Sequence, residues 1–271
     1  MTPSYPAKGT AVITGASGGI GSRYAEHLAR RGYDLILVAR DIGRINTLCD
    51  RLASEFSVCA EGIAADLGEP EGLQRVEERL RADERVTMLV NNAGTGATTT
   101  LVDSRQAQID QMIALNVAAL TRLTYSVVPG FIERGAGTLI NIASVVGLVP
   151  ELLNGVYGAT KAYVLAFSRS LHHELASKGV RVQVVLPGAI ATNFWADSGL
   201  PVEQLPSEVV MSADDLVAAA LAGFDLGEFA TIPSLPNVAD WNAYERALDA
   251  LRPNLSRTLP AIRYRVPTVD A

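Results

Sequence analysis

The chain of 271 residues is long enough for one large α/β domain or two small ones, and its 48% hydrophobic and 19% charged residues are typical of a globular protein with a sizeable core. Its net charge of −6 and pI near 5.2 argue against a nucleic-acid binder and give no support for attraction to an anionic membrane surface. The two cysteines, Cys49 and Cys59, match no metal or redox spacing. This excludes a disulfide scaffold and indicates a reducing compartment, so we expect a cytoplasmic protein.

The sequence gives no sign of targeting or membrane insertion. Residues 1–9 lack the charged and apolar regions of a signal peptide. No apolar run approaches the roughly 18 residues of a membrane span. We therefore expect neither a membrane nor a nucleic acid as a partner.

The first predicted element is a strand at 10–14, which runs directly into a glycine-rich turn, Thr14-Gly-Ala-Ser-Gly-Gly-Ile-Gly21. A helix of about 19–31 follows. Glycines let the backbone come close to a phosphate, and the free amides and the dipole of a helix N-terminus favour an anion. The G-x-x-x-G-x-G spacing of Gly15, Gly19 and Gly21 therefore predicts a phosphate-binding turn. A plain tight turn is the alternative.

A second strand, 34–39, is apolar throughout, which is typical of a strand buried on both faces, and it ends beside Arg40. In dinucleotide-binding folds an acidic residue at this point binds the ribose 2′-hydroxyl of NAD, whereas an arginine accommodates the 2′-phosphate of NADP. Arg40 therefore favours NADP(H), with a solvated surface arginine as the alternative. Asp41 leaves NAD(H) possible, although we expect it to cap the helix of about 42–55.

Two further strands end at polar or small residues. The third, 57–64, precedes Asp66 and Leu67, and Asp66 is either an acceptor for an adenine amino group or an ordinary loop aspartate. An amphipathic helix of about 70–82 leads to the fourth strand, 86–90, which precedes Asn91-Asn-Ala-Gly94. Small residues after a central strand suit close packing against a cofactor, and a simple turn is the alternative.

A long helical region, about 104–134, carries Asn116 near its middle. Asparagine is a poor helix former, so we expect it either to be exposed or to have a specific task. The fifth strand, 138–142, is followed by Ser144, and the next helix carries Tyr157 and Lys161. Residues four apart share a helix face, and a neighbouring ammonium lowers the pKa of a phenol toward the range of proton transfer near neutral pH. An incidental surface pair is the alternative.

The remaining pattern completes an α/β architecture. A sixth strand, 180–186, ends at Pro187-Gly188 and is followed by an irregular segment, 189–212. A helix at 214–224, a short strand at 229–232 and a last helix at 240–251 follow. Strands that alternate with helices predict a doubly wound, Rossmann-type parallel sheet of about seven strands with helices on both faces. Ligands of such sheets bind beyond the carboxyl ends of the strands, so the residues named after each strand are expected to meet in one pocket.

Taken together, these motifs resemble the short-chain dehydrogenase/reductases, in the shorter single-domain branch, over about residues 8–232. The resemblance rests on the glycine turn, Asn91–Gly94, Asn116, Ser144, Tyr157-x-x-x-Lys161 and Pro187-Gly188-x-x-x-Thr192, which occur in order and at the usual separations. It implies one Rossmann-fold oxidoreductase domain over 1–271, with a substrate loop at about 189–212. An extension at about 235–271 carries no family signature.

The resemblance also implies an activity, which is hydride transfer between C4 of a nicotinamide and a carbonyl or alcohol carbon. Tyr157 would be the general acid in reduction, Lys161 would lower its pKa and hold the nicotinamide ribose, and Ser144 would polarise the substrate oxygen. Asn116 would hold a water that links Lys161 to solvent. No metal is implied. The implied cofactor lining is Gly15, Ser17, Gly19, Ile20, Gly21, Arg40, Asp66, Leu67, Asn92, Ala93, Gly94, Tyr157, Lys161, Pro187, Gly188, Ile190 and Thr192.

Substrate contacts are expected from 147–155 and 189–212. Both segments are apolar in part, which predicts a mostly apolar small-molecule carbonyl or alcohol. The resemblance further implies a homodimer or homotetramer built on the helices around 104–134 and 155–177.

Two alternatives stay open. The first is a catalytically silent NADP(H)-binding sensor or scaffold, which the intact set at Asn116, Ser144, Tyr157 and Lys161 disfavours. The second is an epimerase or dehydratase of nucleotide sugars. The glycine spacing and the lack of a substantial C-terminal domain weigh against it.

Overall fold

The computed structural model describes residues 8–264. The chain divides into two compact units, Met1–Ser234 and Leu235–Ala271. The first unit contains the sheet and the candidate site. In the described part of the second, the helix α9 (Val238–Leu251) has no buried residue and is followed by two short 3-10 turns, Arg252–Asn254 and Ile262–Tyr264.

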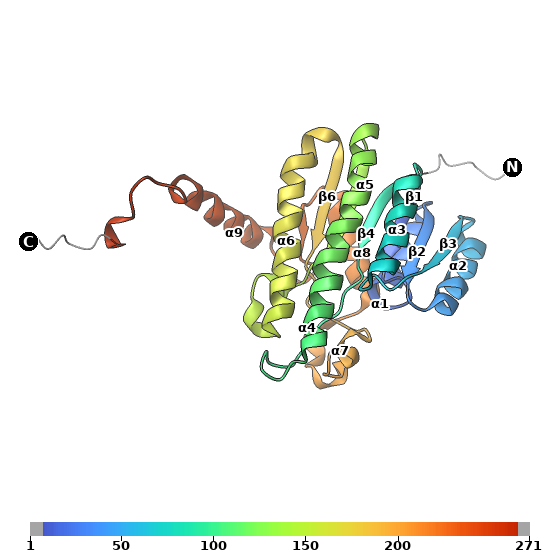
Figure 1. Cartoon of the computed structure of the whole chain (residues 1–271), viewed down its shortest axis with the longest axis horizontal. Coiled ribbons are helices and arrows are strands. Elements are labelled where there is room, and N and C mark those ends of the chain that lie inside the picture. The colour runs from blue at the N-terminus through green and yellow to red at the C-terminus, as the bar shows by residue number, and fades with distance from the viewer. Residues whose placement is uncertain (1–7, 265–271) are drawn as a thin grey trace, which may run out of the picture. The chain divides into compact units, whose positions relative to one another are not determined.

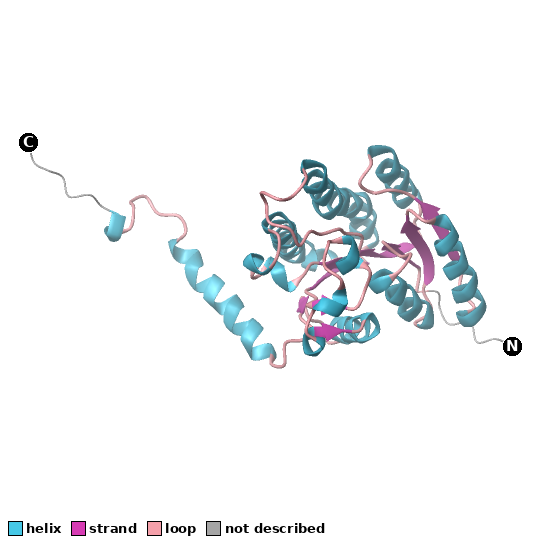
Figure 2. Cartoon of the chain, turned by 90° about the horizontal axis from the view of Figure 1, so that it is seen from below, coloured by secondary structure: helices cyan, strands magenta, loops and turns pink. Residues whose placement is uncertain are grey.

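Seven parallel strands form the sheet of the first unit, in the order β3-β2-β1-β4-β5-β6-β9. The strands are drawn in magenta in Figure 2. The strand order reverses between β1 and β4, and ligands of doubly wound sheets bind at this switch point. The predicted fold class is confirmed. The strands are β1 (Thr10–Thr14), β2 (Asp34–Ala39), β3 (Ala60–Ala64), β4 (Val86–Asn91), β5 (Gly137–Ile142), β6 (Val180–Val185) and β9 (Ala230–Thr231).

Helices cover both faces of the sheet because successive side chains of a strand point to opposite sides. In β1, Ala11 and Ile13 pack in a core with α1, α2 and α8, whereas Val12 packs with α3, α5 and α6. Figure 1 shows α3, α5 and α6 together on one face. The helices are α1 (Gly19–Arg30), α2 (Ile42–Phe56), α3 (Pro70–Ala82), α4 (Gln106–Ile113), α5 (Leu120–Arg134), α6 (Gly155–Leu175), α7 (Phe194–Asp197) and α8 (Ala213–Asp225).

Two segments differ from the sequence-based expectation. The third strand begins at Ala60 rather than at Ser57, because Ser57 ends α2 in the left-handed conformation, with φ 57°, and its N–H donates to the Ala53 carbonyl at 3.0 Å. The segment 189–212 is more ordered than expected. It contains α7 and a two-stranded parallel sheet of β7 (Ala189–Ile190) and β8 (Val210–Met211).

The long predicted helix is continuous but changes its winding. Between α4 and α5 lies a π-helical segment, η1 (Ala114–Ala119), which contains Asn116. Such π segments are rare and occur frequently at functional sites. The helical run therefore widens at Asn116, one of the predicted site residues.

One correction concerns membrane spans. Within residues 8–264, the run Gln106–Arg134 is long and apolar enough to cross a membrane by length and composition alone. In its most apolar window, 44% of the residues are buried inside the protein. Core helices of soluble proteins pass the same test, so this run is weak evidence for a membrane span.

Candidate active site

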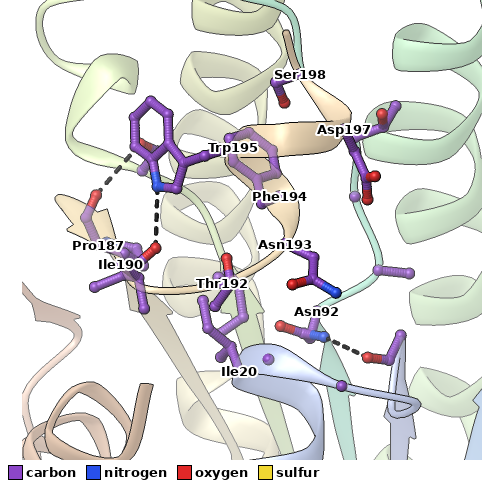
Figure 3. A pocket seen from close by; sticks show the side chains of 18 of the residues that line it. Ile20, Asn92, Pro187, Ile190, Thr192, Asn193, Phe194, Trp195, Asp197 and Ser198 are labelled. Carbon is purple, nitrogen blue, oxygen red and sulfur yellow. Dashed lines mark hydrogen bonds between the residues drawn. The ribbon is translucent and has the colours of Figure 1, made fainter. Parts of the chain in front are cut away.

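A cavity of about 1190 Å³ lies beyond the carboxyl ends of the strands (Figure 3). It is lined from every strand end that the sequence singled out, as expected for a doubly wound sheet. Gly21 and Asn116 are the two predicted site residues that do not line it. The predicted residues that do are Gly15, Ser17, Gly19, Ile20, Arg40, Asp66, Leu67, Asn92, Ala93, Gly94, Ser144, Tyr157, Lys161, Pro187, Gly188, Ile190 and Thr192.

The glycine turn has the backbone that an anion site needs. Gly15 and Gly19 have φ of +67° and +52°, a conformation that residues with a side chain rarely adopt. Helix α1 begins after Gly18 and has no side-chain cap, so its first amides are free to bind a ligand. A β-carbon on Gly21 would lie 2.3 Å from the Gly15 carbonyl oxygen. The turn therefore fits a dinucleotide phosphate, and Gly21 contributes through close packing rather than through a contact with the cavity.

Asn92 supports this turn from the next strand. Its Nδ2 donates to the carbonyls of Thr14 at 2.9 Å and Gly15 at 3.2 Å. The Thr14 hydroxyl accepts the N–H groups of Asn92 at 3.0 Å and Ala93 at 2.9 Å. The polar part of Asn92 thus fixes the turn. Thr14, the first residue of the predicted turn, is the centre of the link.

The packing of Gly21 leads to a stability prediction. Gly21→Ala is expected to lower the free energy of unfolding by about 1 to 3 kcal/mol, because the new methyl group forces the helix away from the turn. Gly18→Ala is the matched control, since a β-carbon there meets nothing within 4 Å and φ is 178°. Urea unfolding of the two variants checks this. Equal stability of Gly21→Ala and Gly18→Ala would contradict it.

Three arginines from neighbouring segments line the cavity, namely Arg23, Arg40 and Arg44. Asp41 caps α2, as predicted, because its Oδ1 accepts the Arg44 N–H at 3.0 Å. Its Oδ2 pairs with Arg44 Nε at 3.3 Å. The Asp41 carboxylate is therefore engaged within α2. Arg23 and Arg44 were missed because no motif marks them.

Asp66 lines the cavity and also shapes its own loop. Its Oδ1 accepts the N–H of Gly68 at 2.9 Å, which is the hydrogen bond of an Asx turn. Leu67, next to it, is buried. The predicted contact of Asp66 with an adenine amino group stays a prediction.

The predicted catalytic side chains come together inside the protein. Asn154 caps α6 by accepting the N–H groups of Val156 and Tyr157 at 2.9 and 3.2 Å. Tyr157 and Lys161 are each 6% exposed, so the alternative of an incidental surface pair is wrong. Lys161 Nζ lies 5.8 Å from the centre of the Tyr157 ring and donates to the Ile142 carbonyl at 2.9 Å. Ser144, 8% exposed, donates to the Pro187 carbonyl at 3.3 Å.

Burial is the main cause of the pKa shifts of Tyr157 and Lys161. Burial raises the pKa of Tyr157. A hydrogen bond with the Ser144 side chain lowers this pKa, but its effect is smaller than that of burial. The net pKa of Tyr157 is therefore raised in the cofactor-free protein, because desolvation outweighs the hydrogen bond with Ser144. The predicted lowering of this pKa by Lys161 stays a prediction. Burial also lowers the pKa of Lys161 to about 8. Both groups are thus displaced toward their neutral forms.

Asn116 does not line the cavity, but its side chain has a structural role. The sequence left open whether this residue is exposed or has a specific task. It is 2% exposed. Its Oδ1 accepts the Thr95 N–H at 2.9 Å, and its Nδ2 donates to the Thr95 carbonyl at 2.8 Å and to the Thr160 hydroxyl at 3.0 Å. The Thr160 hydroxyl donates to the Tyr157 carbonyl at 2.8 Å. Asn116 thereby ties the segment after β4 to the helix that carries Tyr157, and its predicted hold on a water stays a prediction.

Comparison with known proteins identifies the family. The family model described as short chain dehydrogenase matches residues 9–201. The chain belongs to the short-chain dehydrogenases. The resemblance inferred from the motifs is confirmed.

Solved structures of this family resemble the chain closely. A short-chain dehydrogenase from Sphingobium yanoikuyae in complex with NADPH is 47% identical, with a TM-score of 0.92 over 95% of this chain and 100% of that one. The bulky-bulky ketone specific alcohol dehydrogenase from Comamonas testosteroni is 43% identical, with a TM-score of 0.88 over 95% of this chain and 99% of that one. The relatives are named as enzymes, which supports catalysis over the sensor alternative.

A more distant relative is the very-long-chain 3-oxoacyl-CoA reductase of Anas platyrhynchos. It is 37% identical over 189 residues, which make up 68% of this chain and 60% of that protein. The chain thus spans about 60% of the length of the curated relatives that it matches.

The cavity of this short-chain dehydrogenase also has a largely apolar side that the motifs do not mark. Trp195 is buried, and its Nε1 donates to the Ile190 carbonyl at 3.0 Å, which fixes the start of α7 (Figure 3). Gln111 and Leu115 reach the cavity from α4 and η1, and the sequence analysis missed both because no motif surrounds them. The apolar residues on this side are Val145, Val146, Leu152, Leu153, Phe194, Trp195, Leu205 and Val209.

The buried ammonium of this short-chain dehydrogenase makes its stability depend on pH. Between pH 8 and 10.5 the unfolded chain holds a proton on Lys161 that the folded chain has lost, so the stability of the cofactor-free protein rises with pH across this window. The gain is at most about 3 kcal/mol.

Lys161→Met isolates this contribution from other titrating groups. The free energy of unfolding of the variant should exceed that of the wild type most at pH 7.5, and the excess should shrink by pH 10.5. Urea unfolding at both pH values measures it. An excess that is independent of pH would contradict the lowered pKa.

Proposed function

We propose that the protein is an NADPH-dependent reductase of ketones that carry large apolar groups, and that it oxidises the corresponding secondary alcohols in reverse. One observation carries the proposal: the Ser144 and Tyr157 side chains meet an apolar wall formed by Val146, Leu153 and Phe194 within one cavity. The specificity for bulky ketones named for the 43% identical dehydrogenase supports this choice of substrate. The NADPH bound in the 47% identical structure supports the cofactor.

The residues that line the cavity fit NADPH. The glycine turn and the free amides of α1 suit the pyrophosphate, and Arg40 and Arg44 suit a 2′-phosphate. Lys161 Nζ and the backbone of Asn92–Gly94 suit the nicotinamide ribose. Bound NADPH supplies a hydride to the carbonyl carbon, which leaves the protein to place the substrate and to deliver a proton.

Tyr157 is positioned to give that proton. Burial keeps its pKa raised, so the phenol holds its proton throughout the neutral range and is available as the acid in reduction. Ser144 has a long, 3.3 Å hydrogen bond to the Pro187 carbonyl, which its hydroxyl can exchange for one to the substrate oxygen. The two hydroxyls would then hold the oxygen between them.

Lys161 stabilises the phenolate that remains after the proton has moved. Its pKa of about 8 leaves it mostly charged at neutral pH, and its Nζ lies 5.8 Å from the Tyr157 ring. A cation at this distance favours the anionic form of the phenol. This interaction opposes the raising of the Tyr157 pKa by burial and thereby eases the loss of the proton to the substrate oxygen.

The test is NADPH oxidation at 340 nm with a panel of ketones, aldehydes and 3-oxoacyl thioesters. The proposal predicts that aryl alkyl and dialkyl ketones with two large groups give the highest kcat/KM. A clear preference for 3-oxoacyl thioesters would instead favour the activity named for the 37% identical relative. The proposed substrate class fails if neither kind of ketone is turned over while NADPH still binds, measured by its fluorescence.

We also propose that the enzyme is cytoplasmic and forms a homodimer or homotetramer. Its two cysteines, Cys49 and Cys59, are unpaired, which supports a reducing compartment. Tyr125 on α5 and Tyr163 on α6 are 73% and 36% exposed, and such large apolar side chains are candidates for cover by another subunit. Analytical ultracentrifugation would test the assembly, and a monomer at micromolar concentration would contradict it.

A further inference from the structure

The segment 94–99, which follows β4, is tied to three parts of the site. Asn116 holds Thr95 on both of its backbone groups, as described above. The N–H and the hydroxyl of Thr98 donate to the Ser198 carbonyl at 3.1 and 2.8 Å. Asn154 Nδ2 donates to the Thr99 carbonyl at 2.7 Å. The segment therefore fixes the π-helical bulge, the start of α6 and the end of α7 relative to one another.

Gly96 lies within this segment, at a place where a side chain does not fit. A β-carbon built on it would lie 2.5 Å from Phe194 Cζ, 2.9 Å from Phe194 Cε2 and 3.3 Å from Tyr157 Cδ2. Its φ lies outside the left-handed region, so the backbone itself does not require glycine. The absent side chain is what matters here, because it leaves a notch beside Tyr157.

The Phe194 ring occupies that notch. Its centre lies 5.5 Å from the centre of the Tyr157 ring, and it stands edge-on to Trp195 at 5.7 Å. Helix α7, which carries Phe194, is held at both ends, by the Trp195–Ile190 bond and by the Thr98–Ser198 bonds. Figure 3 shows Phe194 among the residues that line the cavity. The place of the ring is thus set by hydrogen bonds on either side of it.

We propose that Phe194, seated in the notch that Gly96 leaves, is a specificity-determining residue for this reaction. Its ring forms the wall of the substrate site beside the Tyr157 phenol and sets the largest group that a ketone can carry on that side. This inference rests on the proposed function, because it concerns how that ketone is accommodated. Differences of a few carbon atoms in such an apolar site change kcat/KM by about tenfold or more.

The experiment compares two aryl ketones that differ on one side, acetophenone with a methyl group and butyrophenone with a propyl group. Phe194→Ala removes the wall and is expected to raise the butyrophenone-to-acetophenone ratio of kcat/KM by about tenfold. Gly96→Ala drives the ring out of its notch into the site and should lower the ratio by about as much. In the double variant the new methyl group has no ring to displace, so the ratio should return to that of Phe194→Ala.

Gly155→Ala is the matched control. Gly155 lies in the segment 147–155 but does not line the cavity, and a β-carbon at this first residue of α6 meets nothing within 4 Å, so its ratio should equal that of the wild type. Phe194→Leu provides a graded second change that does not depend on the folding of Gly96→Ala. It should raise the ratio by less than Phe194→Ala does. NADPH titration by fluorescence shows that each variant keeps its cofactor site.

The outcomes separate the two proposals. A wild type that reduces neither these two ketones nor any bulkier ketone of the panel while binding NADPH would contradict the proposed function. A wild type that reduces both, with a ratio that neither Phe194 variant moves, would overturn the role of Phe194 alone. A double variant that keeps the loss seen in Gly96→Ala would show that Gly96 acts on the fold and not through the ring.

Discussion

Replacing Tyr157 by Phe is expected to lower kcat/KM for ketone reduction by about a thousandfold and to leave NADPH affinity nearly unchanged. The substitution removes one hydroxyl and keeps the ring that packs 5.5 Å from Phe194, so the volume of the buried site is preserved. Ser144 can still hold the substrate oxygen, but the phenol that would protonate it is gone. Steady-state kinetics with the best ketone of the panel and NADPH titration by fluorescence measure the two effects separately.

The same helix offers a matched control for this substitution. Tyr163 is six residues further along α6, and its hydroxyl bonds that of Thr121 at 2.8 Å. Tyr163→Phe removes an identical hydroxyl outside the cavity and should keep the wild-type rate. A Tyr157→Phe variant that retains a tenth of the wild-type rate would show that the phenol is not the proton donor.

The sequence could predict those features in which the functional residues lie only a few positions apart in the chain. Tyr157 and Lys161 lie one helical turn apart, and Gly15, Gly19 and Gly21 lie between a strand and a helix. In both cases, neighbours in the chain are neighbours in space, so the pattern alone places the side chains. The alternation of apolar strands and amphipathic helices predicts the doubly wound sheet for the same reason.

The features that it could not predict are contacts between distant segments. Thr98 meets Ser198 across 100 residues of sequence, and Gly96 meets Phe194 in the same region. No local pattern shows that a glycine after β4 leaves room for a ring on α7. The net raising of the Tyr157 pKa could not be predicted for a related reason. The charge of Lys161 is visible in the sequence, whereas the burial that raises the pKa depends on the complete fold.

Replacing Arg40 is expected to have a second large effect, on the preference for NADPH over NADH. Arg40→Asp should lower the NADPH-to-NADH ratio of kcat/KM by at least about a hundredfold, because a charge-assisted bond to the 2′-phosphate is lost and a like charge is introduced. An acidic side chain at the end of β2 can bond the ribose 2′-hydroxyl, so activity with NADH should be kept or improved. Steady-state kinetics with both cofactors and one saturating ketone measure the ratio.

Two further variants distinguish a local effect of Arg40 from a change in net charge. Arg40→Gln removes the charge without repulsion, and its ratio should lie between those of the wild type and Arg40→Asp. Arg51→Asp makes the same charge change on α2, where Arg51 pairs with Glu26 and Glu55 away from the cavity, and it should leave the ratio unchanged. If Arg40→Asp and Arg51→Asp lowered the ratio equally, the cofactor would sense only the overall field of the protein. If Arg40→Asp left the ratio unchanged, the preference for NADPH would instead lie with Arg23 and Arg44, which line the same cavity.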